Sequence, residues 1–542
     1  MKPQLKQTKP YKPPLENRNE MIRLDFNENT SNSNPALEKV LLCLSVEDIS
    51  QYPNYKGLNE AIAEYACIKE TMVLPTNGCD EAIKLVIDAF VSENDEVVIP
   101  KPSFSMFFIY AQAAGAEIKS PQYYENGEFP IEEVLNSIND KTKLVIVCSP
   151  NNPTGTTIKE SDLERILQKT NGAVLLDEAY FEFSGKTAVG LLEKYDNLII
   201  SRSFSKAFGL AGLRIGYLLS NTETIQSMKS IYSPYAVNII AKKAAVECLK
   251  DPRYMKDYVL EVKENKAKLD GFLLKNEIVF IKGEANFVLC DFKKSREFVV
   301  NSLFREGILV RSQTELEGNV RITVGDKRKN EILIKTLEKI LSKPILIFDL
   351  DGVLIDVSNS YRKAIQETVK FFSGNEVSTN EIQEVRDNEL LNNDWEITKR
   401  LLEKQGKKIP FEGIVEKFQE FYLGKNFDGL IKNEKLLIDK RKLEKLSSNY
   451  ELTIFTGRPR KEAEFTLEYF KIEECFSSII CMEDCKEKPN PEGIQKILAN
   501  SVFKKAIYFG DSSVDLKAAE NAGIKGIMTN KKNIENMLEE LK

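Results

Sequence analysis

The chain has 542 residues, more than one hydrophobic core usually organises, so two or more domains are expected. Its formal net charge of −6 gives no general attraction for nucleic-acid phosphates, and no apolar run has the length of a membrane span or of a signal peptide core. We therefore expect a folded, cytoplasmic protein that binds neither nucleic acid nor membrane.

The residue types present limit the possible chemistry. With no histidine in the chain, Ser-His-Asp catalysis, histidine-ligated zinc and imidazole general bases are excluded. Nine cysteines without a repeated spacing are typical of reduced core residues, and the isolated pair Cys481 and Cys485 favours a structural role over a metal site. Catalysis must therefore use Lys, Asp, Tyr or a cofactor.

Short apolar runs alternate with longer amphipathic stretches, which predicts an α/β fold with a mostly parallel sheet. The runs are EVVIP (96–100), KLVIVCSP (143–150), AVLLDEAY (173–180) and NLIIS (197–201).

The same pattern starts again at PILIFDLDG (344–352), after a polar helical stretch that ends at Lys343. This predicts one domain over residues 1–341 and a second over 342–542. A charged, helix-rich segment at about 357–445, which holds the single tryptophan Trp395, predicts a helical cap on the second domain.

The segment SRSFSKAFGLAGLRIGY (201–217) follows a strand-like run and contains Lys206, a candidate Schiff-base lysine. The hydroxyls of Ser203 and Ser205 and the guanidinium of Arg214 are donors of the kind that a doubly charged phosphate needs. The alternative is a helix start with a solvated lysine.

Asp177 stands at the end of an apolar strand, where a buried carboxylate is costly unless it has a partner. A protonated pyridine nitrogen is such a partner, although Asp177 could instead cap a helix. The turn SPNNPTG (149–155) follows another strand, and its Asn152, together with Tyr180, could bind a phenolic oxygen of a cofactor.

TNGCDEAI (76–83) combines a glycine turn with the start of a helical pattern. The amides of Cys79 and Asp80 could therefore face a phosphate at a helix N-terminus. Phe104 is placed to stack on a ring.

In this order and spacing, these segments resemble the fold-type I, class I/II aminotransferases over nearly all of residues 1–340. The resemblance implies that pyridoxal 5'-phosphate is the cofactor, with Lys206 bonded to it and shuttling the proton and Asp177 pairing with its ring nitrogen. It also implies that Asn152 and Tyr180 contact the phenolic oxygen. Ser203, Ser205 and Arg214 are then expected to hold the phosphate.

Within that superfamily, the chain resembles the histidinol-phosphate aminotransferases through LDFNEN (24–29), QYPNYKG (51–57) and VRITVGD (320–326). The resemblance implies a homodimer in which Tyr52 reaches the cofactor phosphate of the neighbouring subunit. It implies glutamate and 2-oxoglutarate as co-substrates. The positions that receive the substrate are matched by Tyr11, Asn27, Arg311 and Arg321.

Two features depart from that pattern: Thr30 stands where the family usually has proline, and the stretch between Arg311 and Arg321 is short. A threonine-phosphate decarboxylase-like lyase, or an aromatic or other aminotransferase, therefore remains an alternative for the first domain.

In PILIFDLDGVLID (344–356) an apolar strand delivers Asp349 and Asp351 to its end, where ligands of open α/β sheets bind. Two adjacent carboxylates repel each other unless a divalent cation neutralises them, and oxygen ligands favour magnesium. A plain Asp-Gly turn is the alternative, whereas the acidic spacing of an EF-hand is absent. Further polar residues follow strand-like runs at Thr456, Lys488, Asp511 and Asp515.

This second set resembles the haloacid-dehalogenase superfamily phosphatases over residues 344–542. The resemblance implies that Asp349 is the nucleophile, that Asp351 is the general acid and base, and that Thr456 and Lys488 bind the phosphoryl oxygens. It implies Mg²⁺ held by the Asp349 carboxylate, the Asp351 carbonyl and Asp511, with Asp515 in support.

The cap segment resembles a subgroup associated with histidinol-phosphate phosphatase activity. Together the two halves predict a bifunctional enzyme of histidine biosynthesis that makes histidinol phosphate and then hydrolyses it. A lyase fused to a phosphatase with another phosphomonoester as substrate is the alternative. A non-catalytic role for one half is disfavoured because Lys206 and Asp349 are both present.

Overall fold

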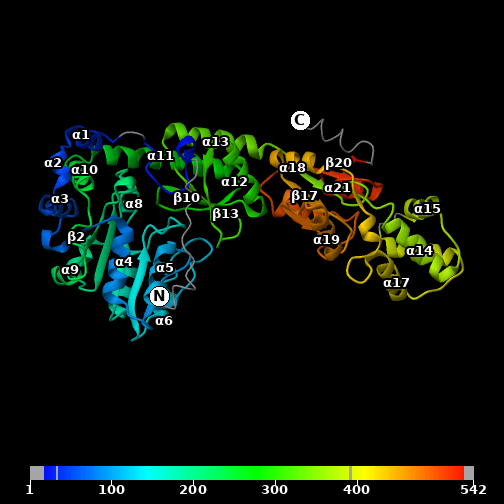
Figure 1. Cartoon of the computed structure of the whole chain (residues 1–542), viewed down its shortest axis with the longest axis horizontal. Helices are drawn as coiled ribbons and strands as arrows, with labels where there is room; N and C mark the ends of the chain where they lie inside the picture. The colour runs from blue at the N-terminus through cyan, green and yellow to red at the C-terminus, as the bar shows by residue number, and fades with distance from the viewer. Residues whose placement is uncertain (1–17, 32–33, 390–392, 530–542) are drawn as a thin grey trace. The chain divides into compact units, whose positions relative to one another are not determined.

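The computed structural model describes residues 18–31, 34–389 and 393–529, so Tyr11 lies outside the described residues. The chain divides into two compact units (Figure 1). The first contains the described residues up to Asp291 together with Leu303–Thr336, and the second contains Phe292–Ser302 and the described residues from Leu337 onward. This division falls inside helix α13 (Lys327–Leu341), and the domain boundary expected at 341/342 remains a prediction.

A seven-stranded sheet forms the centre of the first unit, in the order β2-β8-β7-β6-β5-β3-β4. Only β8 runs antiparallel to its neighbours. The strands are β2 (Val73–Thr76), β3 (Glu96–Val98), β4 (Glu117–Lys119), β5 (Thr142–Cys148), β6 (Ala173–Asp177), β7 (Leu198–Ser203) and β8 (Gly216–Leu219). The four apolar runs of the sequence are thus confirmed as β3, β5, β6 and β7.

Helices cover this sheet because their apolar sides pack against strands that are buried on both faces. Helices α4 and α5 lie against one face (Figure 1), where Ile83, Val86 and Phe107 join the strand residues of the core. The helices are α1 (Pro35–Cys43), α2 (Val46–Ser50), α3 (Lys56–Ala66), α4 (Gly78–Phe90), α5 (Ser105–Ala114), α6 (Ile131–Ser137), α7 (Glu160–Lys169), α8 (Phe181–Ser184), α9 (Thr222–Lys229), α10 (Ile239–Lys250) and α11 (Arg253–Lys275).

A smaller antiparallel sheet in the order β12-β13-β10-β9 follows α11 in the chain. Its strands are β9 (Val279–Ile281), β10 (Phe287–Asp291), β12 (Arg311–Ser312) and β13 (Asn319–Thr323), with α12 (Arg296–Arg305) between β10 and β12 in sequence. The short strand β1 (Ile22–Arg23) pairs in parallel with β11 (Ile308–Leu309), which anchors the start of the described chain.

The second unit has a five-stranded, fully parallel sheet in the order β18-β17-β14-β19-β20. Its strands are β14 (Ile345–Phe348), β17 (Leu452–Phe455), β18 (Ser478–Ile480), β19 (Ala506–Gly510) and β20 (Lys525–Met528). The helices α18 (Lys440–Asn449), α19 (Arg460–Phe470), α20 (Glu492–Ala499) and α21 (Ser513–Asn521) accompany it.

The cap of the second unit is helical and has its own hydrophobic core. It consists of α14 (Tyr361–Ser373), α15 (Thr379–Glu389), α16 (Asp394–Lys404) and α17 (Phe411–Leu423), and α14, α15 and α17 gather apart from β17 and β20 (Figure 1). The paired strands β15 (Ile355–Asp356) and β16 (Lys435–Leu436) mark where the chain leaves the sheet core and returns to it. Leu443 of α18 packs in the core of the sheet, and the cap bounds expected at about 357–445 remain a prediction.

Across the described part of the chain, no helix combines the length and apolar character that crossing a membrane requires. All nine cysteines lie in described residues and all are free thiols.

Candidate functional sites

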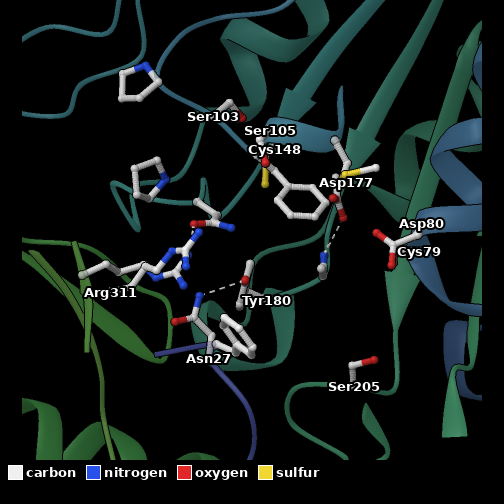
Figure 2. Close-up of a pocket in the computed structure, with 18 of the residues that line it drawn as sticks. Asn27, Cys79, Asp80, Ser103, Ser105, Cys148, Asp177, Tyr180, Ser205 and Arg311 are labelled. Carbon is white, nitrogen blue, oxygen red and sulfur yellow. Dashed lines mark hydrogen bonds between the residues drawn. The ribbon is translucent and has the colours of Figure 1, made fainter. Parts of the chain in front are cut away.

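The first unit contains a cavity of about 1010 Å³ at the carboxyl ends of the central strands. In Figure 2, Asp177, Tyr180 and Ser205 surround one open space, and Asn27 and Arg311 lie across it from Asp80. Thirteen residues that the sequence singled out line the cavity: Asn27, Cys79, Asp80, Phe104, Asn152, Asp177, Tyr180, Ser203, Ser205, Lys206, Arg214, Arg311 and Arg321. Folding therefore brings together positions from eight separate sequence segments.

Lys206 lies in a turn after β7, so the alternative of a lysine at a helix start does not apply. Its Nζ donates to the Phe26 carbonyl at 2.9 Å. Burial, together with the nearby charge of Arg321, lowers the pKa of Lys206 to about 8. Near pH 7, a larger fraction of the Lys206 amine is therefore neutral than in an exposed lysine. The neutral amine is the form that acts as a nucleophile or a base.

Asp177 is the last residue of β6, and only 3% of its surface is exposed. One carboxylate oxygen accepts the Ala179 amide at 3.0 Å, whereas the N-cap of the following helix α8 is Tyr180. Burial raises the pKa of Asp177 to about 6. Among the described residues no cation contributes to the pKa shift of Asp177, so this buried acid at a cavity wall is suited to a cationic ligand group.

The opposite wall holds a chain of hydrogen bonds. Asn27 donates from Nδ2 to the Tyr180 hydroxyl at 3.0 Å and accepts from Thr323 Oγ1 at 3.1 Å. Arg321 donates to Asn152 Oδ1 and to the Asp25 carbonyl. Since each of these side chains has a partner, their orientations toward the cavity are set before a ligand binds.

A third wall is formed by the N-terminus of α4 and by Arg214, whose Nη2 is 2.7 Å from Asp80 Oδ2. Gly78 has φ +80°, and a Cβ there would lie 2.6 Å from Arg214 Nη2. Ser203 Oγ accepts the Ser205 amide at 3.0 Å. Helix amides, hydroxyls and a guanidinium at one place make a fitting site for a phosphate.

The two departures from the family pattern have local explanations. Thr30 is buried, its amide donates to the Tyr258 hydroxyl at 3.2 Å, and its hydroxyl accepts the Asp326 amide at 2.7 Å. A proline would lack both groups. The short stretch after Arg311 is a turn between β12 and β13 that sets Arg311 directly opposite Arg321.

Tyr52 is not part of this cavity wall. Its ring stacks on Tyr235 with 4.2 Å between centroids, and 78% of its surface is exposed. A role toward a neighbouring subunit remains a prediction for this residue.

In the second unit, the carboxyl end of β14 delivers Asp349 into a buried cluster of charges. Lys488 Nζ lies 3.0 Å from Asp349 Oδ1, 2.8 Å from Asp515 Oδ1 and 2.6 Å from the Tyr508 hydroxyl. Burial and the neighbouring acids raise the pKa of Asp349, although Lys488 opposes the shift. The predicted residues Asp349, Asp351, Thr456, Lys488 and Asp511 line one cavity.

Carboxylate oxygens of Asp349, Asp511 and Asp515 lie within 4.8 Å of one another, in an arrangement that could hold a cation. A Cβ at Gly352, which has φ +74°, would lie 1.9 Å from Asp511 Oδ2, so the glycine leaves room for this carboxylate. Three hard oxygen donors with adjacent negative charges suit Mg²⁺. The Asp351 carboxylate stands apart from this group and binds Arg458 Nε at 2.7 Å.

Several residues of the second site were not found from the sequence. Tyr508 bonds to both Lys488 and Asp515, and Arg458 bonds to Asp351. From the cap, Arg386 and Asp394 also line the cavity and pair at 2.7 Å. Only the TGRP sequence at 456–459 could have drawn attention to Arg458, because it places an arginine directly after a predicted phosphate-binding threonine.

Comparison with known proteins assigns both units. Residues 19–337 match the family described as aminotransferase class I and II, and residues 346–529 match haloacid dehalogenase-like hydrolase. A histidinol-phosphate aminotransferase of Caldanaerobacter subterraneus subsp. tengcongensis is 41% identical over 295 residues, which cover 54% of this chain and 84% of the relative. One from Anoxybacillus flavithermus is 34% identical over 361 residues, covering 63% and 97%.

Solved structures agree on the fold. The histidinol-phosphate aminotransferase from Clostridium acetobutylicum gives a TM-score of 0.55 at 27% identity and covers 59% of this chain and 99% of that one. The enzyme from Sinorhizobium meliloti, in complex with pyridoxal-5'-phosphate, gives 0.58 at 23% identity, covering 62% and 96%. The chain therefore belongs to the class I and II aminotransferases, with a fold-type I aminotransferase domain followed by a haloacid dehalogenase-like hydrolase domain.

Proposed function

We propose that the chain catalyses two consecutive reactions of histidine biosynthesis in the cytoplasm. The first domain transfers the amino group of glutamate to imidazole-acetol phosphate, which gives histidinol phosphate and 2-oxoglutarate. The second domain hydrolyses histidinol phosphate to histidinol and phosphate. The main support for the proposed transamination is the pair Arg311 and Arg321. These residues lie opposite each other on β12 and β13, in the cavity that Lys206 also lines. Two guanidinium groups suit substrates that bear a phosphate or a second carboxylate.

Pyridoxal phosphate fits the residues of this cavity. The buried Asp177 would pair with its ring nitrogen, and Tyr180 and Asn152 would face its phenolic oxygen. Gly78 leaves space beside Arg214, where the α4 amides, Ser203 and Ser205 would hold the phosphate. When bound, the cofactor supplies an electron sink for the negative charge that forms at the substrate Cα. Lys206 Nζ is the base that takes the Cα proton, helped by its lowered pKa.

In the hydrolase domain, an Asp349 oxygen attacks the phosphorus while the bond from phosphorus to the substrate oxygen breaks. Asp351 gives its proton to that leaving oxygen. Water then attacks the phosphorus and gives its proton to Asp351, which frees phosphate and restores the Asp349 carboxylate. Lys488, 3.0 Å from Asp349, offsets the negative charge on the phosphoryl oxygens, and Thr456 donates to them.

Magnesium fits the acidic group beside Asp349. Asp349 and Asp511 would hold the ion, with the Asp351 carbonyl as a further ligand, and Asp515 would support the site through Lys488 and its hydrogen bond from Ser512. The ion supplies charge that neutralises the transferring phosphoryl group. The Gly352 position, which admits the Asp511 carboxylate, supports this proposal.

A homodimer through the aminotransferase domain belongs to the proposal. Large apolar side chains of α1 and α2 are exposed, with Leu42 at 87% and Val46 at 85%, as is Tyr52. A surface of this kind on neighbouring helices favours burial against a second copy. A sedimentation mass equal to one chain would contradict the dimer.

The test is to incubate the purified protein with histidinol phosphate and 2-oxoglutarate and to follow glutamate and inorganic phosphate separately. We expect both products, because transamination is then read in reverse. Phosphate without glutamate would leave the hydrolase assignment standing and contradict the paired pathway. Threonine phosphate is the matched comparison, since CO₂ release from it would favour a decarboxylating lyase.

A further inference from the structure

Arg458 is one of the largest side chains in the described structure that is fully buried, with none of its side-chain surface exposed. It follows Thr456 and Gly457 at the carboxyl end of β17, and it lines the cavity of the hydrolase domain. A guanidinium in such a place is costly unless each of its donors has a partner. The burial of the Arg458 guanidinium therefore points to a role other than stabilising the fold.

The partners of Arg458 come from three parts of the hydrolase domain. Nε donates to Asp351 Oδ1 at 2.7 Å, and Nη1 donates to Thr466 Oγ1 of α19 at 2.8 Å. Nη2 and Nη1 donate to the two oxygens of Glu434 at 3.0 and 3.2 Å. One positive charge thus holds two carboxylates, and the pair with Glu434 is bidentate.

Glu434 connects this group to the cap. It directly precedes β16, where the chain returns from the cap, and its side chain is buried. The same carboxylate accepts the Tyr422 hydroxyl at 2.9 Å and the Ser360 hydroxyl at 3.1 Å, at the two ends of the helical cap. The ring of Tyr361 lies 5.0 Å from the Arg458 guanidinium carbon. Arg458 therefore joins Asp351, through Glu434, to residues at the two ends of the helical cap.

We propose that Arg458 is a positioning residue of the hydrolase domain, which fixes one carboxylate oxygen of Asp351 and anchors it through Glu434 to the base of the cap. This assignment rests on the proposed phosphatase function. With Oδ1 held by Arg458 and 30% of the Asp351 side chain exposed, the second oxygen is left for proton exchange with the substrate. Proton transfer needs that oxygen within hydrogen-bond reach of the leaving group.

The test uses the full chain with two aryl esters of similar shape, phenyl phosphate and p-nitrophenyl phosphate. Phenolate is a basic leaving group that needs a proton as it departs, whereas p-nitrophenolate leaves readily without one. In Arg458→Gln, we expect kcat/KM for phenyl phosphate to fall at least about tenfold more than kcat/KM for p-nitrophenyl phosphate, because kcat/KM reports the step in which the leaving group departs. Arg458→Lys should show a smaller difference between the two esters than Arg458→Gln, since one donor group remains for Asp351. Asp351→Asn should show the same leaving-group pattern more strongly.

Arg460→Gln is the matched control, because Arg460 lies two residues further on and pairs with Glu464 and Asp484 away from Asp351. Arg460→Gln should change the rates on both esters by the same factor. The double variant Arg458→Gln with Glu434→Gln removes one buried charge of each sign, and it serves if the single variant does not fold. We expect the double variant also to lose more activity on phenyl phosphate than on p-nitrophenyl phosphate.

Folded Arg458 variants could lose the same factor on both esters while Asp351→Asn shows the leaving-group effect. That result would overturn the assignment of Arg458 and leave the proposed phosphatase function standing. A wild-type protein that releases phosphate from neither ester would overturn the proposed phosphatase function and the assignment with it. A double variant with the wild-type ratio of the two rates would also overturn the assignment.

Discussion

The carboxylate of Asp177 is buried at the end of β6 with one amide hydrogen bond from Ala179. Burial raises its pKa from the usual 3.8 to about 6, so the folded, cofactor-free protein binds this proton more tightly than the unfolded chain. Its free energy of unfolding therefore falls as the pH rises from about 4 to about 6 and stays lowered above that. A cationic ring nitrogen beside the carboxylate would reverse this loss.

The corresponding prediction concerns Asp177→Asn, which keeps an oxygen for the Ala179 amide but carries no charge. Without cofactor at pH 7, we expect the variant to be more stable than the wild type by up to ~3 kcal/mol, with the difference vanishing below about pH 3. Hydrogen exchange of the β6 amides across this pH range measures the difference, because it reports on this domain alone. The same variant should lose roughly 100-fold or more in transamination kcat.

Two outcomes would contradict this account of Asp177. A variant less stable than the wild type at pH 7 would mean that the carboxylate has a favourable partner in the cofactor-free protein. A variant with undiminished transamination would mean that Asp177 does not face the ring nitrogen.

Helix α4 begins at Gly78, whose backbone conformation affects the cavity of the aminotransferase domain. Gly78 adopts φ +80°, and its missing side chain leaves the Arg214 guanidinium close to the helix N-terminus. We expect Gly78→Ala to destabilise the aminotransferase domain by ~1 kcal/mol and to weaken cofactor binding about tenfold, because it displaces Arg214. Titration of the cofactor-free protein with pyridoxal phosphate measures the affinity.

Gly57→Ala is the matched control for that substitution. Gly57 lies in α3, and a Cβ there would meet nothing within 4 Å, so the change should raise stability by ~0.5 kcal/mol or more and leave cofactor affinity unchanged. If both variants bound the cofactor as the wild type does, the contact between Gly78 and Arg214 would have no part in binding the phosphate.

At this scale the sequence predicted the elements that carry local signals. The runs at 96–100, 143–150, 173–180 and 197–201 became strands, because strands buried on both faces are apolar throughout. The turn at Gly78 before α4 was also predicted, since a glycine before a helical pattern is a local signal.

Contacts between distant residues could not be predicted in the same way. Arg458 and Glu434 are separated by 24 residues and Arg458 and Asp351 by 107, and no motif marks Glu434. Charged side chains are usually exposed, so their burial follows only from how the cap strands return to the sheet. The order of the central strands, with β8 antiparallel between β2 and β7, likewise follows from packing.

At the scale of the whole molecule, one chain carries two sites with separate chemical groups. The aminotransferase site depends on the amine of Lys206, and the hydrolase site depends on the carboxylate of Asp349. Since the proposed product of the first site is the substrate of the second, covalent linkage raises the local concentration of one site around the other. This benefit requires no shared residue, so the two activities should be separable by single substitutions.

We expect Lys206→Ala to abolish the absorbance of the imine between the lysine and the cofactor and to lower transamination by roughly 1,000-fold or more, while phosphate release stays at the wild-type rate. Asp349→Asn should do the converse. Lys186→Ala, an exposed lysine of the first domain paired with Glu284, should change neither activity. Parallel assays of glutamate and phosphate on each folded variant measure the separation. A loss of both activities from either substitution would mean that the sites depend on each other, because the free amine and the carboxylate take part in different bond-making steps.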